Sequence, residues 1–475
     1  MIIILENIHT AEAPTSDLVG KRPFGDVMFK RRRLSDWQKD LLGKAAPGAR
    51  IYLANREPEL RKLLEDHADA SPILVVPSAA WISDSSELGK LLERVELGRM
   101  DCLIRSGSLT CIYSPKLSSF ARYTELRNGD LHPDVAKLSA QGIIVDLTDY
   151  RNCLDVMSGS LEVRHFNSLS ATDLTLKKRS SKKSKIKAEH DYWHFLPPAM
   201  KRWFVMPYNY VETEDYGEYE MERLNIADLA LQWVHGAVSA QDANALLTIL
   251  TSYLDERPSQ PSDDVAVLAD FDSLFRKKVT NRLEEFTTMP AAARLDSWLK
   301  AGTRFSSLRD IHDEYFDLLD QIQPWRNFQA ARVIGHGDLC FSNMLYERHG
   351  RILKFVDTKG ATTEADLWTH SAYDLAKLAH SWLGDYDFIN TGLFRVELSS
   401  NNRLELVILA DRERSAILKT LFHEWLSGRQ VDLHSMNLLV ASLFLSMLPL
   451  HADHEDKVLA FTLNAIHLLE EASHG

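Results

Sequence analysis

The stretch VIGHGDLCFSNMLYERHGRILKFVDTKG, residues 333–360, decides the fold of the larger part of this 475-residue chain. It contains His336-Gly337-Asp338, then Asn343 five residues after the aspartate, and an apolar segment, 352–356, that ends at Asp357. Metal-assisted phosphoryl transfer requires this order of groups, because one carboxylate aligns an attacking hydroxyl while an amide oxygen and a second carboxylate hold Mg²⁺ on the phosphates of ATP. The short spacing predicts that a loop and a β-hairpin bring the three side chains into one cleft.

An isolated His-x-Asp tripeptide usually means a capped turn, and motif matches are hypotheses. The fuller pattern, HxDxxxxN followed by a strand-ending Asp, resembles the aminoglycoside phosphotransferase and choline kinase family, relatives of the protein kinases. The resemblance implies a two-lobed α+β domain with Asp338 as the catalytic residue and Asn343 and Asp357 as Mg²⁺ ligands. It also implies that His336 stabilises the loop and that Asp374, in Tyr373-Asp374-Leu375-Ala376, braces it.

Composition describes an ordinary globular protein of two or three compact units, with 45% apolar and 26% charged residues. The net charge of −12 argues against wholesale nucleic-acid binding. The four cysteines show no CxxC spacing, so we expect reduced thiols rather than a disulfide framework or a zinc site. The N-terminus lacks the basic flank of a signal peptide, and no apolar run approaches the ~20 residues of a membrane span, so we expect a cytoplasmic protein without a membrane span.

Residues 1–155 alternate strand and helix patterns, which predicts an α/β domain with a mostly parallel sheet. The expected strands and helices are 1–5, 49–53, 73–77, 101–106, 109–114 and 142–147, and 34–42, 57–67 and 86–95.

The segment Arg22-Pro23-Phe24-Gly25-Asp26, close to the N-terminal strand, faintly resembles sugar nucleotidyltransferase domains that head bifunctional sugar-1-phosphate enzymes. Their nucleotide loop is normally rich in glycine, because the backbone must approach phosphates closely. The loop at 9–15 has no glycine and carries Glu12. We therefore expect a degenerate nucleotidyltransferase-like domain used for binding or assembly, with an active transferase as the alternative. The basic run 30–33 is interpreted as a solvated or locally ion-paired segment, with anion or nucleic-acid binding as the alternative.

Residues 156–225 are expected to form a small lobe, with strands at 161–166 and 174–178 and a phosphate-covering hairpin at 167–171 between them. Lys178 is expected at a strand end, and Glu189 inside a helix at 186–195. A strand lysine that reaches the ATP phosphates, held by a helix glutamate, is the usual small-lobe arrangement of kinases. The stretch KRSSKKSKIKAEHDYWHFLPP, residues 178–198, also looks like a bacterial phosphotransferase subgroup associated with capsular or surface-polysaccharide loci.

The small lobe also contains a strongly basic segment. Most of the seven basic residues within 177–187 are interpreted as solvated, and the acidic residues of 212–222 offset their charge.

A strand running into a linker is expected at 219–224, and the resemblance places the adenine-binding hinge there, with Glu220 and Glu222 as cofactor-binding residues.

Residues 226–475 are expected to be mostly helical and to complete an acceptor pocket. The predicted helices are 227–235, 240–254, 263–285, 310–321, 368–383, 411–427 and 433–450, with a loop at 258–261. Lys359 is interpreted as an exposed lysine beside a turn, with a ligand role as the alternative.

These patterns together predict an ATP- and Mg-dependent phosphotransferase acting on a hydroxyl of a small molecule, most plausibly a sugar or a surface-polysaccharide precursor. The alternatives are a non-catalytic nucleotide-binding module and a bifunctional sugar kinase/nucleotidyltransferase.

Overall fold

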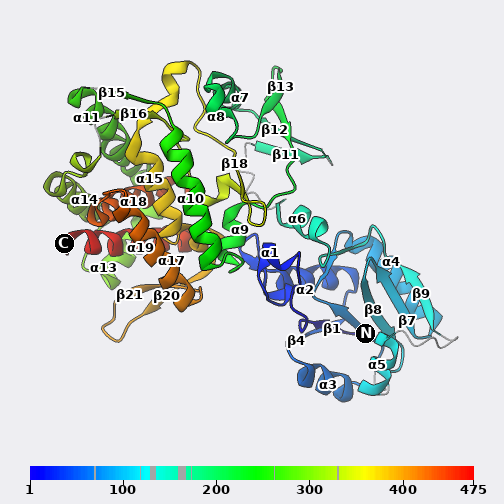
Figure 1. Ribbon diagram of the computed structural model, residues 1–475. Coiled ribbons are helices and arrows are strands. Elements are labelled where there is room, and N and C mark those ends of the chain that lie inside the picture. Colours follow the sequence, from blue (N-terminus) through cyan, green and yellow to red (C-terminus); the bar gives the residue numbers. More distant parts are fainter. Residues whose placement is uncertain are drawn as a thin grey trace. The chain divides into compact units, whose positions relative to one another are not determined.

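A computed structural model describes residues 1–68, 71–117, 119–128, 135–158, 167–172, 174–261, 263–328 and 331–474 (Figure 1). The chain forms two compact units. Unit 1 is Met1–Glu162 with His235–Ala237, and unit 2 is Val163–Val234 with Val238–Gly475. The expected boundary at residue 155 falls inside helix α6 (Tyr150–Ser158), which belongs to unit 1.

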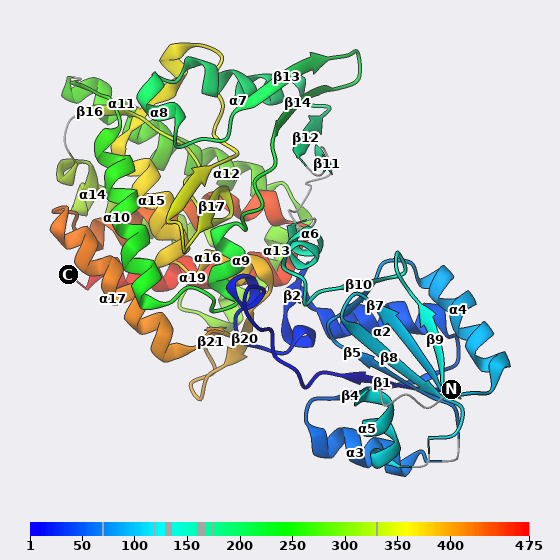
Figure 2. The same cartoon turned by 45° about the vertical axis from the view of Figure 1, so that its right-hand side comes forward.

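Unit 1 is an α/β domain (Figure 2). Strand β1 (Ile2–Glu6), the second of the six strands in its sheet, is buried along its whole length. In the sheet order β4-β1-β5-β8-β7-β9, β1 is parallel to both neighbours and β7 is parallel to β9, while β8 runs opposite to β5 and β7. The other strands are β4 (Arg50–Ala54), β5 (Ile73–Pro77), β7 (Cys102–Ser106), β8 (Leu109–Ser114) and β9 (Ala136–Ser139). The helices before α6 are α1 (Ser16–Val19), α2 (Leu34–Ala45), α3 (Glu57–Asp66), α4 (Ser85–Gly98) and α5 (Phe120–Asn128).

Two segments of unit 1 depart from a simple sheet. The strand expected at 142–147 is β10 (Ile144–Asp146), which pairs with β6 (Ala80–Ile82) outside the main sheet. Asp146 fixes this position, because its carboxylate accepts hydrogen bonds from the backbone and hydroxyls of Ser108 and Thr148. The basic run 30–33 lies at the hairpin of β2 (Met28–Phe29) and β3 (Arg32–Arg33).

The charges of that hairpin are locally paired. Arg32 contacts Asp40 at 2.9 Å and Arg33 contacts Asp26 at 3.5 Å. These contacts agree with the locally ion-paired interpretation.

The small lobe of unit 2 is an antiparallel sheet of order β11-β12-β14-β13, against which α7 packs. Segment 167–171, expected as a hairpin loop, is itself a strand that pairs along its whole length with β12, and the strand expected at 161–166 lies outside the described residues. The elements are β11 (Asn167–Ala171), β12 (Thr175–Ser180), α7 (Lys183–Phe195), α8 (Pro198–Lys201), β13 (Pro207–Glu212) and β14 (Gly217–Glu222).

The large lobe is mainly helical. It consists of α9 (Leu229–Val234), α10 (Ala240–Glu256), α11 (Asp264–Asp272), the π-turn η2 (Ser273–Lys277), α12 (Lys278–Thr287), α13 (Pro290–Gly302), α14 (Leu308–Ile322), the 3₁₀ turn η3 (Pro324–Asn327), α15 (Ser371–Trp382), α16 (Tyr386–Thr391), α17 (Arg412–Gly428), α18 (Leu433–Met447), the 3₁₀ turn η6 (Leu448–His451) and α19 (Glu455–Ser473). Its strands and remaining 3₁₀ turns are β15 (Ser259–Pro261), β16 (Ala331–Ile334), η4 (Phe341–Asn343), β17 (Met344–Glu347), β18 (Ile352–Phe355), η5 (Glu364–Leu367), β19 (Trp368–His370), β20 (Phe394–Leu398) and β21 (Leu404–Ile408).

Several parts of the large lobe were not expected, and the helix expected at 368–383 begins only at Ser371, after the strand β19. The segment around Pro258 and Pro261 is not a loop, because β15 pairs with β16. Helices α13 and α19 and the hairpin β20–β21 carry no expectation from the sequence.

The segment Leu433–His451 is long and apolar enough to cross a membrane, with a mean hydropathy of 1.6, contrary to the expectation that no such run exists. However, 83% of its most apolar window is buried, and α18 packs against α19, α12 and α15. Core helices pass the same test of length and composition, so this is weak support for a span.

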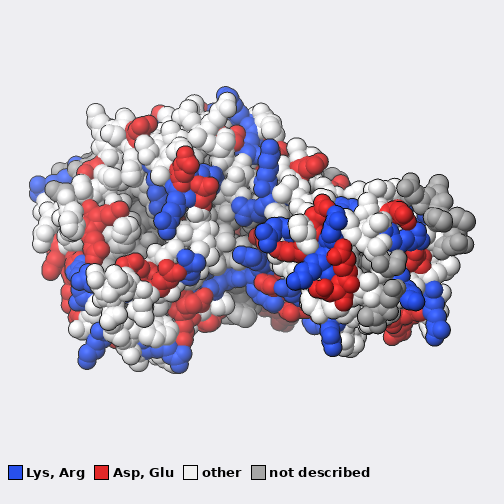
Figure 3. All heavy atoms as spheres, turned by 90° about the horizontal axis from the view of Figure 1, so that it is seen from below, with Lys and Arg blue, Asp and Glu red and all other residues white. Residues whose placement is uncertain are grey.

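Acidic and basic side chains are interspersed on the face of the molecule shown in Figure 3. The excess of acidic residues is therefore not gathered into one field on that face.

Candidate active site

The small lobe and the stretch 333–360 meet at Lys178. Its Nζ lies 2.6 Å from Glu189 Oε2 and 2.8 Å from Asp357 Oδ1. Lys178 and Glu189 are both buried, with side chains 8% and 4% exposed, whereas the Asp357 side chain is 45% exposed. Burial alone lowers the pKa of Lys178, but the carboxylates of Asp357 and Glu189 more than offset this, so the pKa is raised and the amine is cationic. Lys178 on β12 therefore contacts the carboxylate of Glu189 on α7 and that of Asp357 at the end of β18.

Local structure explains why these side chains converge. Side chains alternate between the faces of β12, so Lys178 turns inward while Lys177 faces outward to Glu218 and Glu220. Lys178 lies inside β12, which continues to Ser180, and not at a strand end as expected. Asp357 has φ 55°, in the left-handed region that aspartate tolerates better than most residues, and the chain turns there after β18.

Asp374 on α15 stabilises the loop that carries Asp338 by hydrogen bonds to its backbone. Asp374, fully buried, accepts hydrogen bonds from the backbone N–H groups of His336 (2.9 Å) and Gly337 (2.8 Å) and from Arg257 Nη1 (3.0 Å). His336 Nε2 donates to the Val356 carbonyl at 3.0 Å, and its Nδ1 accepts from the Asp338 backbone N–H at 3.1 Å. Burial lowers the pKa of His336, which fits a neutral ring with this pattern of bonds.

Asp338 forms an ion pair with a residue that the sequence patterns did not single out. Lys377 Nζ lies 2.9 Å from Asp338 Oδ1, with the two side chains 14% and 43% exposed. Partial burial raises the pKa of Asp338, but Lys377 outweighs it and the net pKa is lowered to about 2. The carboxylate is therefore ionised at neutral pH and is a weak base. It is suited to orienting a hydroxyl by accepting its hydrogen bond.

Asn343 completes the loop. Its Nδ2 donates to the Asp338 carbonyl at 2.8 Å and to the Asp338 carboxylate at 3.2 Å. The amide oxygen is then the atom of Asn343 that can ligate a cation. One amide oxygen with the Asp357 carboxylate fits Mg²⁺, which is bound by one or two carboxylates together with substrate phosphates rather than by an all-protein cage. Among the described residues, no group of three or more His, Cys, Asp or Glu side chains is arranged to hold a metal ion.

No contact within the described part of the chain places either hinge glutamate, Glu220 or Glu222, at this cluster. Glu220 lies inside β14 between β12 and β13, and its carboxylate contacts Lys177 at 3.2 Å and Asn209 at 3.2 Å. Its backbone and side chain are thus engaged within the sheet, because it sits two residues before the strand ends. Glu222, exposed, is the last residue of β14, so the linker that can face a nucleotide begins there.

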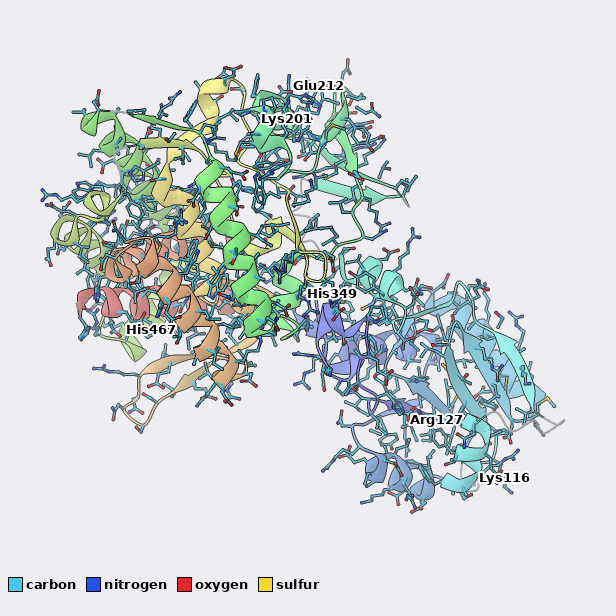
Figure 4. All side chains as sticks on the ribbon, viewed as in Figure 1. Lys116, Arg127, Lys201, Glu212, His349 and His467 are labelled. Atoms are coloured by element: carbon cyan, nitrogen blue, oxygen red, sulfur yellow. The ribbon has the colours of Figure 1, made fainter. Side chains whose placement is uncertain are left out.

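The basic segment 177–187 is largely neutralised, as expected. Lys177 and Arg179 pair with Glu218, and Lys183 lies 3.5 Å from Glu212, which is labelled in Figure 4.

Two cavities of unit 2 differ in their relation to this chemistry. A small cavity of about 30 Å³ is lined by Glu189, Tyr219, Met221 and Asp357 among others. A larger one of about 480 Å³ lies between β21, α17 and α19, and none of the predicted site residues lines it within the described part of the chain. The charged groups of the predicted site therefore lie at the smaller cavity and not at the larger one.

Two glycines of the quoted stretch are required by close approach. Gly337 has φ 78°, and a Cβ there would lie 2.6 Å from the Lys359 side chain. Gly360 has φ 82°, and a Cβ there would lie 2.9 Å from Ala188 Cβ on α7. Lys359 itself is exposed and bonds the Trp368 carbonyl at 3.3 Å, which fits the interpretation as a lysine beside a turn.

Sequence reasoning missed Lys377 and Arg257. Lys377 had a usable signal, because it follows Asp374 by three residues on one helix and so shares its face. Arg257 had none, because it lies far from the motif in sequence and its contact with Asp374 is purely tertiary.

Comparison with solved structures gives similarities to small-molecule phosphotransferases and kinases. An apo thermostable mutant of aminoglycoside phosphotransferase APH(4)-Ia is 11% identical, with 65% of this chain and 95% of that chain covered and a TM-score of 0.37. A glucosamine kinase in complex with glucosamine, ADP and inorganic phosphate is 12% identical, with 70% and 85% covered and a TM-score of 0.37. The ethanolamine kinase of Plasmodium vivax is 10% identical, with 68% and 87% covered and a TM-score of 0.34.

No protein-family model matches the chain, and no curated protein matches it either. At these identities and TM-scores, the chemistry has to be derived from the geometry of the chain itself.

Proposed function

We propose that unit 2 is an ATP- and Mg-dependent phosphotransferase that moves the γ-phosphoryl group to a hydroxyl of a small molecule. One observation carries the proposal: Lys178 Nζ lies within 2.8 Å of carboxylate oxygens of both Glu189 and Asp357, so the consecutive elements β12 and α7 are joined to the end of β18, 179 residues further along the chain. A lysine held in this way, close to a carboxylate that can ligate a metal ion, is what a phosphate clamp requires.

Each group has a role in the proposed reaction. Lys178, fixed by Glu189, binds the phosphates. Asp338 accepts the hydrogen bond of the attacking hydroxyl and orients it, and Lys377 places a second positive charge beside that carboxylate. Asn343 and Asp357 would hold Mg²⁺, whose charge when bound offsets the charge of the phosphates. Little covalent chemistry is left for the protein, so positioning and charge compensation supply the rate.

We propose a sugar or a surface-polysaccharide precursor as the acceptor and the cytoplasm as the site of the reaction. The likeness of residues 178–198 to phosphotransferases of capsular loci supports the first point. The four cysteines, all buried and free, support a reducing compartment. We also propose that unit 1 is a nucleotidyltransferase-like binding domain, supported by its α/β sheet and by the absence of glycine from loop 9–15.

The test is a screen of sugars and small alcohols for acceptor-dependent ADP formation, with Asp338→Asn as the inactive comparison. Asp366→Asn is the matched control, because Asp366 caps η5 through Thr362 and Thr363. We expect loss of several orders of magnitude in kcat for Asp338→Asn and near-normal turnover for Asp366→Asn. ATP binding without turnover on any acceptor would instead establish a nucleotide-binding module, and equal activity of the two variants would remove Asp338 from the reaction.

A further inference from the structure

Unit 1 contains a cavity of about 280 Å³ at one edge of its sheet. It is bordered by the last residue of β1, Glu6, by the end of β5 at Pro77 and Ser78, and by the start of β8 at Thr110. The carboxyl ends of the parallel strands β1 and β5 therefore meet at this cavity. Crevices at the carboxyl ends of strands are where open α/β sheets bind their ligands.

The floor of the cavity carries a buried charge. Glu6 is 3% exposed, and its Oε1 lies 2.8 Å from Arg127 Nη1 and 3.4 Å from His9 Nε2. Arg127, on α5, is 39% exposed and is labelled in Figure 4. A carboxylate this deeply buried is usually matched by a partner, and here Arg127 supplies the charge. Arg127 Nη2 also contacts His9 Nε2, and Nη1 lies 3.4 Å from the Tyr123 hydroxyl. A guanidinium has five N–H donors, so donors beyond these contacts can serve a ligand.

The hydroxyl groups of the wall are oriented by their neighbours. The hydroxyls of Ser108 and Thr148 both donate to the Asp146 carboxylate, at 2.7 and 2.6 Å. Each of these oxygens therefore presents lone pairs to a ligand. Tyr123 and Ile112 give the cavity an apolar surface.

We infer that this cavity binds an uncharged, compact polyhydroxylated ligand of the monosaccharide class. A hydroxyl group both donates and accepts, so it can satisfy the acceptors Glu6, Ser108 and Thr148 and the donor Arg127 together. A phosphate offers only acceptor oxygens at neutral pH, and it would face a carboxylate and the lone pairs of two hydroxyls. The volume, just below the ~300–1,000 Å³ of sites for drug-sized ligands, also favours one sugar ring over a nucleotide.

This inference rests on unit 1 alone and is independent of the proposed phosphotransferase reaction. The test is titration calorimetry on the full chain with D-glucose, D-galactose, D-mannose, N-acetyl-D-glucosamine and myo-inositol, with glucose 1-phosphate and UTP as charged comparisons. We expect saturable binding of at least one uncharged compound. Glu6→Gln and Arg127→Gln are each expected to weaken it about tenfold or more, because each removes a charged hydrogen-bonding partner.

Matched variants separate this site from other effects. Arg122→Gln is the control for Arg127→Gln, since Arg122 lies on the same helix and pairs with Asp101 at 2.8 Å outside the cavity. Thr110 also lines the cavity, and its hydroxyl would be a further hydrogen-bonding group for the same ligand. Thr110→Val keeps the shape of the side chain and removes only that hydroxyl, so it is expected to weaken binding without loss of thermal stability, even if the charge variants fail to fold.

Binding is expected to be unchanged in Arg122→Gln and in Asp338→Asn. Tighter binding of glucose 1-phosphate or UTP than of every uncharged compound would overturn the inference. So would the absence of binding by the uncharged panel, or binding that survives Thr110→Val, Glu6→Gln and Arg127→Gln but is lost in Asp338→Asn.

Discussion

Replacing Lys377 with methionine tests the part of the proposed mechanism that the sequence motif did not reveal. Methionine keeps much of the length of the side chain and removes its charge. Asp338 loses the partner at 2.9 Å, but its side chain is 43% exposed and can be hydrated. We therefore expect the variant to fold and to bind ATP.

The size of the effect depends on what Lys377 does. The fall of the Asp338 pKa from 3.8 to about 2 corresponds to ~2 kcal/mol at 1.36 kcal/mol per pKa unit, which solvent screening reduces to ~1 kcal/mol. Even without this effect Asp338 stays ionised near pH 7, so ionisation is not what the variant loses. A cation that stabilises charge on the transferring group contributes ~3–4 kcal/mol, or about 10²–10³ in kcat.

The assay is steady-state ADP formation between pH 5 and 9 with an acceptor found by the screen. We expect kcat of Lys377→Met to fall by about 10²–10³ at every pH, with the KM for ATP changed by less than about tenfold, because Lys178 still clamps the phosphates. Lys419→Met is the control, since it breaks another Lys–Asp pair of the same lobe, with Asp385 at 2.6 Å.

Two results would refute this reasoning. Recovery of full activity at alkaline pH would mean that Lys377 acts only by keeping Asp338 ionised. A loss of activity in Lys419→Met equal to that in Lys377→Met would mean that the effect is a general one of removing a lysine.

Three further predictions concern buried ionisable side chains of unit 2. Lys178→Met leaves the buried Glu189 carboxylate without its partner at 2.6 Å, so the free energy of unfolding should fall by ~3–5 kcal/mol and ATP binding should weaken. An unchanged melting temperature would contradict a stabilising role of the ion pair. Asp374→Asn removes the charge opposite Arg257 and one acceptor of the catalytic loop, so kcat should fall more than KM rises, and a pure KM effect would argue against bracing. Burial raises the pKa of Asp387 to about 7, so the folded state keeps a proton that the unfolded state releases near pH 4. The free energy of unfolding should therefore decline by up to ~4 kcal/mol as pH rises from about 4 to 7. The melting temperature of Asp387→Asn should depend less on pH over this range, and an identical pH dependence would show that Asp387 is not the titrating group.

The sequence by itself determined the features that are local. Runs of apolar and β-branched residues placed β1, β5 and β8 within a residue or so of their ends. The resemblance of residues 178–198 selected Lys178 over Lys177, and in the structure Lys178 is buried against Glu189 while Lys177 contacts Glu218 and Glu220. The spacing of Asp338, Asn343 and Asp357 predicted a loop and a hairpin, which are η4 and β17–β18. Helix α13 and the hairpin β20–β21 escaped prediction, because their apolar faces are defined only by the parts of the lobe that they cover.

Tertiary structure alone decided the partners of the charged groups. Lys377 and Arg257 acquire their roles from Asp338 and Asp374, and the pairing of Arg257 joins residues 117 positions apart. Glu6 likewise ends an ordinary buried strand in the sequence, and only the fold sets it beside Arg127 at the floor of a cavity. The physical reason is that periodicity fixes which face of an element a side chain occupies, whereas burial and ion pairing depend on which other element covers that face.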